Sequence, residues 1–208
     1  MQIDLRTLKT KDAYKLMTGA VVPRPIAWVS TVDADGNRNL APFSFFTVAS
    51  RKPPMLCISI GPGVGERQGT VKDTLQNIRE TSKYVINILG ADLGEAMHET
   101  SLNHAPEVDE FDYAGLTGVL DTVTGIPRVE EAPIAFELEL DRILELGSDH
   151  LILGNVVNYH IQEDYYVEPY KVDLERLNPL GRLAGGYAEM KEFYTLPKVK
   201  GGVMNAKS

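Results

Sequence analysis

Polar side chains recur inside two apolar, strand-like runs near the amino terminus. The first run covers 26–32, and the second begins at Asn39 and carries Ala41, Pro42, Ser44 and Phe45. A strand that only fills a core has no use for Asn, Ser and Pro at its centre. Small and polar residues there would let a flat ligand with a polar edge lie close to backbone freed by Pro42. An edge strand with a bulge is the plain alternative.

A second group of residues has the chemistry of an anion site. Lys72, Asp73 and Thr74 open a predicted helix over 70–82. The amides of a helix N-terminus, an ammonium group and a hydroxyl together suit a phosphate. Asp73 sits oddly beside an anion and is expected to cap the helix. Taken alone, the three residues also describe an ordinary solvated helix start. Arg24, between two prolines, is a second candidate cation.

A third polar point ends the predicted strand over 55–60, at Ser59, Ile60 and Gly61. The glycines that follow permit close approach of backbone to a ligand. This stretch is not a P-loop, because no Gly-Lys-Ser/Thr follows it. The glycines of 181–186 lack the spacing of a dinucleotide fingerprint. A Rossmann-type nucleotide domain is therefore not predicted.

Histidines and carboxylates give no standard metal site. The spacing of His98 and His104 matches no zinc motif, and 33–37 lacks the later Glu of a calcium loop. We expect a hairpin turn at 33–37 and no metal. His150 follows a Gly-Ser-Asp turn at the start of a predicted strand. It has the chemistry of a proton donor, or it is a plain turn histidine.

Composition limits the class of protein. The chain has 208 residues and a net charge of −8, which fits one soluble domain and argues against nucleic acid as a partner. The lone Cys57 cannot form an internal disulfide and is expected to be a buried thiol. The opening residues do not resemble a signal peptide, so none is expected, and no apolar run reaches the ~20 residues that a membrane helix needs. We expect a cytoplasmic protein without membrane contact.

The positioning elements are mostly strands. Apolar and β-branched runs predict strands over 26–32, 39–49, 55–60, 83–89, 134–140 and 151–157. Helices are predicted from an N-cap at Thr10 to Gly19, over 70–82 and over 92–102. One domain is expected over 1–197, followed by a flexible tail over 198–208. The fold class is mainly β, a barrel with flanking helices.

The order of these motifs resembles the flavin reductase-like family of FMN-binding split barrels. The resemblance is carried by Pro-Arg-Pro at 23–25, Asn-Leu-Ala-Pro-Phe-Ser at 39–44, Lys-Asp-Thr at 72–74 and Leu-Gly-Arg-Leu-Ala-Gly-Gly-Tyr at 180–187. It spans about 14–187. It implies a six-stranded split barrel of Greek-key type and a homodimer with FMN at the subunit interface.

The same resemblance implies the site. The implied cofactor-binding residues are Arg24, Asn39, Ala41, Pro42, Ser44, Phe45, Ser59, Ile60, Gly61, Lys72, Asp73, Thr74 and Tyr187. Asp73 would cap the helix or bind the ribityl chain, and Tyr187 would stack near the ring or lie at the dimer interface. His150 is carried over as the catalytic residue, although this chain has Gly-Ser-Asp-His where the family has Gly-Asp-His.

The implied activity is that of an NAD(P)H:flavin oxidoreductase. Hydride from NAD(P)H would reduce FMN, and the reduced flavin would pass electrons to an acceptor. One alternative is a flavoredoxin-like electron carrier that a protein partner reduces. Another is a split barrel that binds no flavin and only binds a different planar ligand or dimerises. A pyridine nucleotide would have to dock against the flavin itself.

Overall fold

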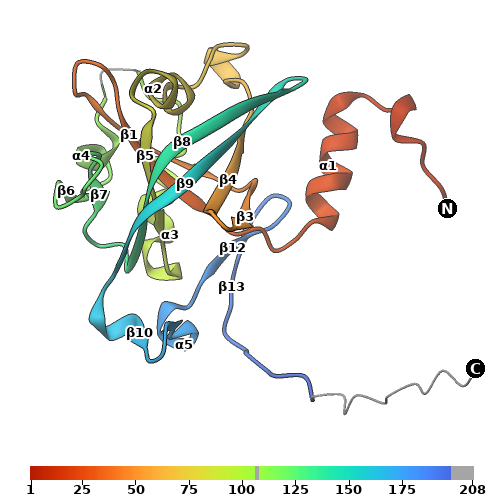
Figure 1. The fold of residues 1–208 in the computed structure, drawn as a ribbon. Helices are drawn as coiled ribbons and strands as arrows, with labels where there is room; N and C mark the ends of the chain where they lie inside the picture. The colour runs from red at the N-terminus through yellow and green to blue at the C-terminus, as the bar shows by residue number, and fades with distance from the viewer. Residues whose placement is uncertain (106–107, 198–208) are drawn as a thin grey trace, which may run out of the picture.

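A computed structural model describes residues 1–105 and 108–197, so the predicted tail over 198–208 lies outside the described residues. The body of the molecule is a seven-stranded antiparallel sheet in the order β2-β1-β5-β8-β9-β4-β3 (Figure 1). Its strands are β1 Ala27–Val32, β2 Arg38–Phe43, β3 Phe46–Arg51, β4 Pro54–Ile60, β5 Lys83–Ile88, β8 Ile134–Leu146 and β9 Asp149–Ile161. The prediction of a mainly β fold is confirmed.

The two ends of this sheet are consecutive in the chain. β2 pairs with β1, whereas β3 pairs with β4, and only Ser44 and Phe45 separate them. The single strand predicted over 39–49 is therefore wrong, and the sheet has seven strands where six were expected. The break itself lies close to β4, because Ser59 N donates to Phe45 O at 2.8 Å.

Proline in β2 does not break its pairing. Pro42 lies opposite Trp28 in a register that runs without a shift through the whole β1–β2 pair. The prediction that Pro42 interrupts the ladder is therefore wrong. β2 stands at one end of the strand order, a position that tolerates a residue without an N–H group.

The main core lies on one face of the sheet. Alternate residues of β4, Leu56, Ile58 and Ile60, are at most 5% exposed and pack with Tyr84 and Ile86 of β5. Period-2 alternation of a strand places such residues on one face. Leu75 and Ile78 of α2, Asp73–Thr81, also join this cluster, so the core holds α2 against the sheet.

A second apolar cluster lies around Trp28 and Leu40. Met97 of α3, Gly94–Glu99, and Phe111 of α4, Glu110–Tyr113, pack against it. Trp28 is fully buried and so is a core residue, and its Nε1 donates to Thr100 Oγ1 at 2.9 Å. Burial of Phe111 anchors the segment after α3 over β2. The helix predicted over 92–102 is shorter, since a 3-10 turn at Ala91–Leu93 precedes α3.

The remaining elements are peripheral. The first helix, α1, is Thr10–Ala20, and it stands away from the sheet (Figure 1). Lys9 is its N-cap, so the prediction of Thr10 as N-cap is off by one residue. The other short elements are β6 Gly118–Val119, β7 Arg128–Val129, β10 Tyr166–Val167, β11 Lys171–Val172, α5 Leu174–Leu177, β12 Leu180–Arg182 and β13 Tyr187–Glu189, with 3-10 turns at Leu5–Thr7, Gly65–Arg67 and Glu163–Tyr165.

The long β8–β9 hairpin extends the alternation predicted over 134–140 by a further six residues, to Leu146. Its turn uses Gly147 at φ +63°, a conformation that glycine adopts without strain. The hairpin turn predicted at 33–37 is also present, with Asp33 Oδ1 accepting from the amide of Asn37 at 2.8 Å. Among the described residues no helix is long and apolar enough to cross a membrane.

Candidate functional site

The break between β2 and β3 opens into a cavity of about 420 Å³, here called the slot. It is lined by Tyr14, Pro42, Phe43, Ser44, Phe45, Ser59, Gly61, Pro62, Val64, Lys72 and Asp149. The rings of Tyr14 and Phe45 lie 6.2 Å apart and form its outer side. A volume of this size, with apolar walls and a few polar groups, is typical of a small-molecule site.

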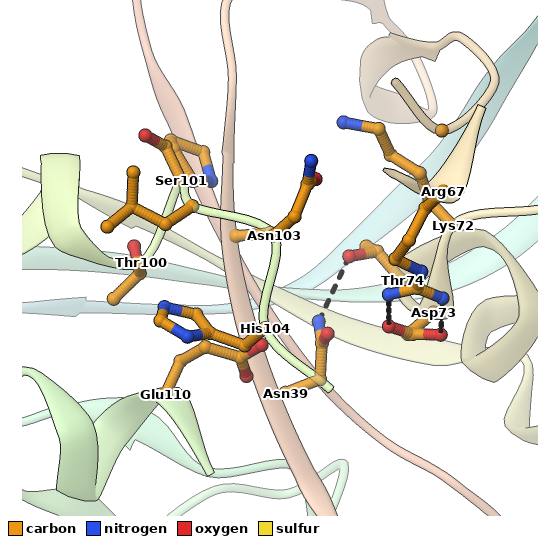
Figure 2. Close-up of a pocket in the computed structure, with 14 residues that line it drawn as sticks. Asn39, Arg67, Lys72, Asp73, Thr74, Thr100, Ser101, Asn103, His104 and Glu110 are labelled. Atoms are coloured by element: carbon orange, nitrogen blue, oxygen red, sulfur yellow. Dashed lines mark hydrogen bonds and ion pairs between the residues drawn. The ribbon is translucent and has the colours of Figure 1, made fainter. Parts of the chain in front are cut away.

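A smaller polar cavity of about 80 Å³, here called the recess, adjoins the slot at Pro42 and Lys72. Figure 2 shows its two walls: Arg67, Lys72, Asp73 and Thr74 on one side, and Thr100, Ser101, His104 and Glu110 on the other, with Asn39 and Asn103 between them. Asn103 Nδ2 donates to Val64 O at 3.0 Å and so links the two loops beside the recess.

Hydrogen bonds fix the floor of the recess. Asn39 is 8% exposed, and its Nδ2 donates to Thr74 Oγ1 at 3.0 Å and to Thr31 Oγ1 at 3.3 Å. Leu40 N, the next amide of β2, donates to Glu110 Oε2 at 3.1 Å. These bonds hold β2, α2 and α4 together. Asn39 and Thr74 therefore give the recess its shape.

Lys72 is the cation at the junction of slot and recess. Burial, and then the nearby Arg67, lower its pKa, and its Nζ lies 5.3 Å from the centre of the Phe43 ring. In the part of the chain that the structure describes, Lys72 forms no ion pair. It also occupies the N-cap of α2 without a side-chain cap bond. A partly buried ammonium without a counter-charge favours an anionic ligand.

Arg67 and Asp73 neutralise each other on the same wall. Arg67 Nη1 and Nη2 donate to the two oxygens of Asp73 at 2.5 and 2.7 Å. Asp73 is therefore occupied by a guanidinium, and it makes no cap bond to the first turn of α2. The predicted cap is not formed because Arg67 takes both carboxylate oxygens.

Arg24 lies apart from the recess. Its guanidinium donates to Thr18 O at 2.8 Å, to Val21 O and Leu183 O at 3.0 Å, and to Ser44 Oγ at 3.3 Å. The side chain is 6% exposed and joins the end of α1 to the segment after β12. This geometry makes Arg24 a structural link that reaches the slot through Ser44 and through Phe45, whose ring centre lies 5.9 Å from the guanidinium carbon. Its predicted role in cofactor binding stays a prediction.

Three other predicted residues do not line the slot or the recess. Ile60 is fully buried in the core, because alternation turns Ser59 and Gly61 toward the slot and Ile60 away from it. His150 pairs with Ile60 and lies on that same face, so Asp149 lines the slot instead. Tyr187 lies against His98, with its hydroxyl 3.4 Å from Nδ1. The roles predicted for His150 and Tyr187 stay predictions.

Sequence reasoning missed several lining residues. Arg67, Asn103, His104 and Glu110 line the recess, and Tyr14 lines the slot. Three of these residues, Asn103, His104 and Glu110, lie in the polar and irregular stretch over 103–118, where no motif marks individual residues. The sequence offers one indication: Glu110 directly precedes the apolar Phe111, and a residue next to a buried aromatic side chain is itself often close to the core.

The single cysteine has no place in either cavity. Cys57 is half-buried on β4, where it pairs with Thr47 and Leu153. Burial raises the pKa of its thiol, although a hydrogen bond from the Thr47 backbone acts in the opposite direction. The thiol is therefore kept in its protonated, unreactive form.

Comparison with known proteins decides the family. The family model described as "Flavin reductase like domain" matches residues 18–181, most of the chain. The chain belongs to the flavin reductase-like family. The match includes β2, β4 and the start of α2, which carry residues that line the slot and the recess.

Solved structures agree with this assignment. The chain is similar to nitrilotriacetate monooxygenase component B from Bacillus cereus, at 34% identity and TM-score 0.88, over 94% of this chain and 98% of that chain. It is also similar to 2-nitrobenzoate 2-nitroreductase from Pseudomonas fluorescens, at 28% and 0.85, over 98% and 100%. The flavoredoxin of Desulfovibrio vulgaris (Miyazaki F) shares the fold, at 20% and 0.77, over 97% and 100%. A flavin reductase structure from Shewanella frigidimarina that is described as having a split barrel domain shares the fold, at 20% and 0.82, over 96% and 100%, so this chain is a split barrel.

Proposed function

We propose that this protein is an FMN-dependent oxidoreductase that transfers hydride from NAD(P)H to FMN and then passes electrons to an acceptor. The observation that supports it most is that the slot and the recess adjoin each other. An apolar slot for a planar ring opens beside a small polar recess, and Lys72 lines both. FMN has this combination of a flat ring and a terminal phosphate, and when bound it would supply the hydride-accepting ring.

The chain's own residues would bind and orient the cofactor. Pro42, Ser44, Phe45, Ser59 and Gly61 line the slot and would contact the ring. Lys72 and the first amides of α2 would bind the phosphate. Asn39 and Thr74 would hold this end of the site in shape through their mutual hydrogen bond. The fit is favourable because the phosphate would supply the counter-charge that Lys72 lacks among the described residues.

We also propose that the protein acts in the cytoplasm as a homodimer. Large apolar side chains are exposed on α1, on β3 and near the tip of the β8–β9 hairpin: Tyr14, Met17, Val48, Leu144 and Leu146. Tyr14 also lines the slot, so a second subunit that covered these residues would close the slot from outside. Light scattering should give about twice the chain mass of 23.0 kDa.

An absorbance experiment tests the proposed function. The purified protein is scanned with and without added FMN, and then with NADH and NADPH under anaerobic conditions. A bound-flavin spectrum that bleaches quickly with either nucleotide supports the proposal. Bleaching only with dithionite would replace the enzyme with a carrier that another protein reduces. Absence of any flavin binding would contradict both.

A further inference from the structure

Glu110 is a buried carboxylate at the recess. It is the first residue of α4, it is 9% exposed, and it lines both the recess and a small polar cavity behind it. Its Oε2 accepts from Leu40 N at 3.1 Å. Figure 2 shows the side chain beside His104, on the wall opposite Lys72. No ion pair involves Glu110 within 1–105 and 108–197.

The charged groups around Glu110 are already committed to other partners. Arg67 is bound by Asp73, and Arg38 of β2 is bound by Asp109 at 2.5 Å and Asp112 at 2.9 Å. Asp33, on the far side of the small cavity, accepts bonds within its own turn. His104 has its Nε2 3.1 Å from Glu99 O. Lys72 is therefore the cation left, in the described part of the chain, to oppose an anion.

The charges do not balance when a phosphate enters the recess. A phosphate monoester carries about −1.5 to −2 charges near pH 7. With Arg67 and Asp73 paired with each other, Lys72 brings one positive charge to the recess, which is fewer than a phosphate dianion needs, and the ionised carboxylate of Glu110 on the opposite wall adds a further negative charge. A dianion added there would face a buried like charge, which favours the protonated form of the carboxyl group. Burial already raises the pKa of Glu110, despite the hydrogen bond from Leu40.

We propose that Glu110 takes up a proton when a phosphate ester binds in the recess, so that ligand binding and protonation of this residue are coupled. The proposal rests on the proposed function only in taking the phosphate of FMN as the ligand group. The proton comes from solvent and is bound by the carboxylate of Glu110. The affinity of the protein for the phosphate ester then falls as the pH rises, because binding consumes a proton and the proton concentration is lower.

Isothermal titration calorimetry measures how many protons the protein takes up when the ligand binds. FMN is titrated at pH 7.5 in two buffers of different ionisation enthalpy, and riboflavin, which lacks the phosphate, serves as the matched ligand. At this pH most of the free FMN phosphate is already dianionic, since its second pKa is about 6. We expect uptake of a measurable fraction of one proton with FMN and none with riboflavin. Equal counts for the two ligands would overturn the proposal.

Two variants identify the residue. Glu110→Gln keeps a carbonyl oxygen for the Leu40 amide, and it should abolish proton uptake and bind FMN about three- to tenfold more tightly at pH 8. The gain should shrink as the pH falls, because the carboxyl group of the wild type is then increasingly protonated before the ligand binds. His104→Asn should retain the uptake. Loss of uptake in His104→Asn and its persistence in Glu110→Gln would assign the proton to His104 and sink the idea.

The wild-type count keeps the proposal testable if Glu110→Gln does not fold, and the outcomes separate it from the proposed function. Failure of the wild-type protein to bind FMN would contradict the proposed function. FMN binding with no phosphate-dependent proton uptake would contradict this inference alone.

Discussion

Arg24 and Lys72 carry the same charge, and both were predicted to bind a phosphate, but the fold uses them differently. Arg24 is buried, and its guanidinium donates to three backbone carbonyls and to Ser44. Lys72 lies at the junction of two cavities, and no carboxylate in the described ranges pairs with it. A buried polar group with all its partners supplied by the protein stabilises the fold, whereas one without them is available to a ligand.

Glu137 resembles Arg24, because it is a buried charged group whose hydrogen-bond partners are all supplied by the protein. Glu137 is fully buried in β8 and accepts hydrogen bonds from the backbone and hydroxyl of Thr124, from Asn158 and from His160, at 2.7 to 2.8 Å. Burial opposes its ionisation, but these hydrogen bonds outweigh burial and lower its pKa to about 2. We therefore place Glu137 with the structural groups.

The largest effect is expected for Arg24→Ala. The change leaves the carbonyls of Thr18, Val21 and Leu183 without their buried donor, so the free energy of unfolding should fall by about 3 kcal/mol. Urea denaturation measures it, and Arg79→Ala, on the exposed side of α2, is the control with a change below about 0.5 kcal/mol. A loss of FMN affinity without a loss of stability would show that Arg24 belongs to the binding site.

A smaller effect is expected from acid. The pKa of Glu137 lies below its ordinary value of 4.5, so its ionised form stabilises the protein above pH 4.5. This contribution is lost as the pH falls from about 4.5 toward 2, and about 2 kcal/mol of it should be lost between pH 6 and pH 3. Denaturation at pH 6 and pH 3 should show a smaller pH dependence for Glu137→Gln than for the wild type. Parallel curves would remove Glu137 from the stabilising groups.

The smallest effect is expected for Lys72→Ala. FMN should bind about fivefold more weakly, or by about 1 kcal/mol, because the phosphate loses one charged contact. Stability without ligand should not fall, since the ammonium has no counter-charge to lose. Lys52→Ala, in the exposed turn between β3 and β4, is the matched control. Equal FMN affinity for both variants would exclude Lys72 from the site.

Much of the scaffold could be predicted because its signals are local. The alternation over 134–140 marked β8, and Lys72 to Thr74 marked the start of α2. The break at Ser44 and Phe45 was missed because the strand-forming Phe43, Phe45 and Phe46 surround the single turn-compatible residue, Ser44. The tertiary pairing of β3 with β4 imposes the break, and the local sequence carries no trace of that pairing.

The candidate site was predictable only in part. Asn39, Ala41 and Thr74 do line the recess, but Glu110 and Asn103 reach it from segments far along the chain. The hydrogen bonds from Arg24 to backbone carbonyls could not be predicted, because no sequence motif marks a carbonyl that will accept from a distant side chain. His150 and Asp149 show a further limit, because adjacent strand residues face opposite sides of a sheet and a shift of one position decides which of them lines the slot. The role predicted for His150 stays a prediction.

The half-buried position of Cys57 bears on how well the protein resists oxidation. An enzyme that reduces flavin in air would generate peroxide beside its own side chains, and thiolates are the groups that peroxide attacks fastest. Because burial raises the pKa of this thiol, little thiolate exists at neutral pH. The chain has one cysteine, so cross-linking or inactivation through sulfur should be slow. The purified protein should therefore tolerate repeated turnover without added reductant.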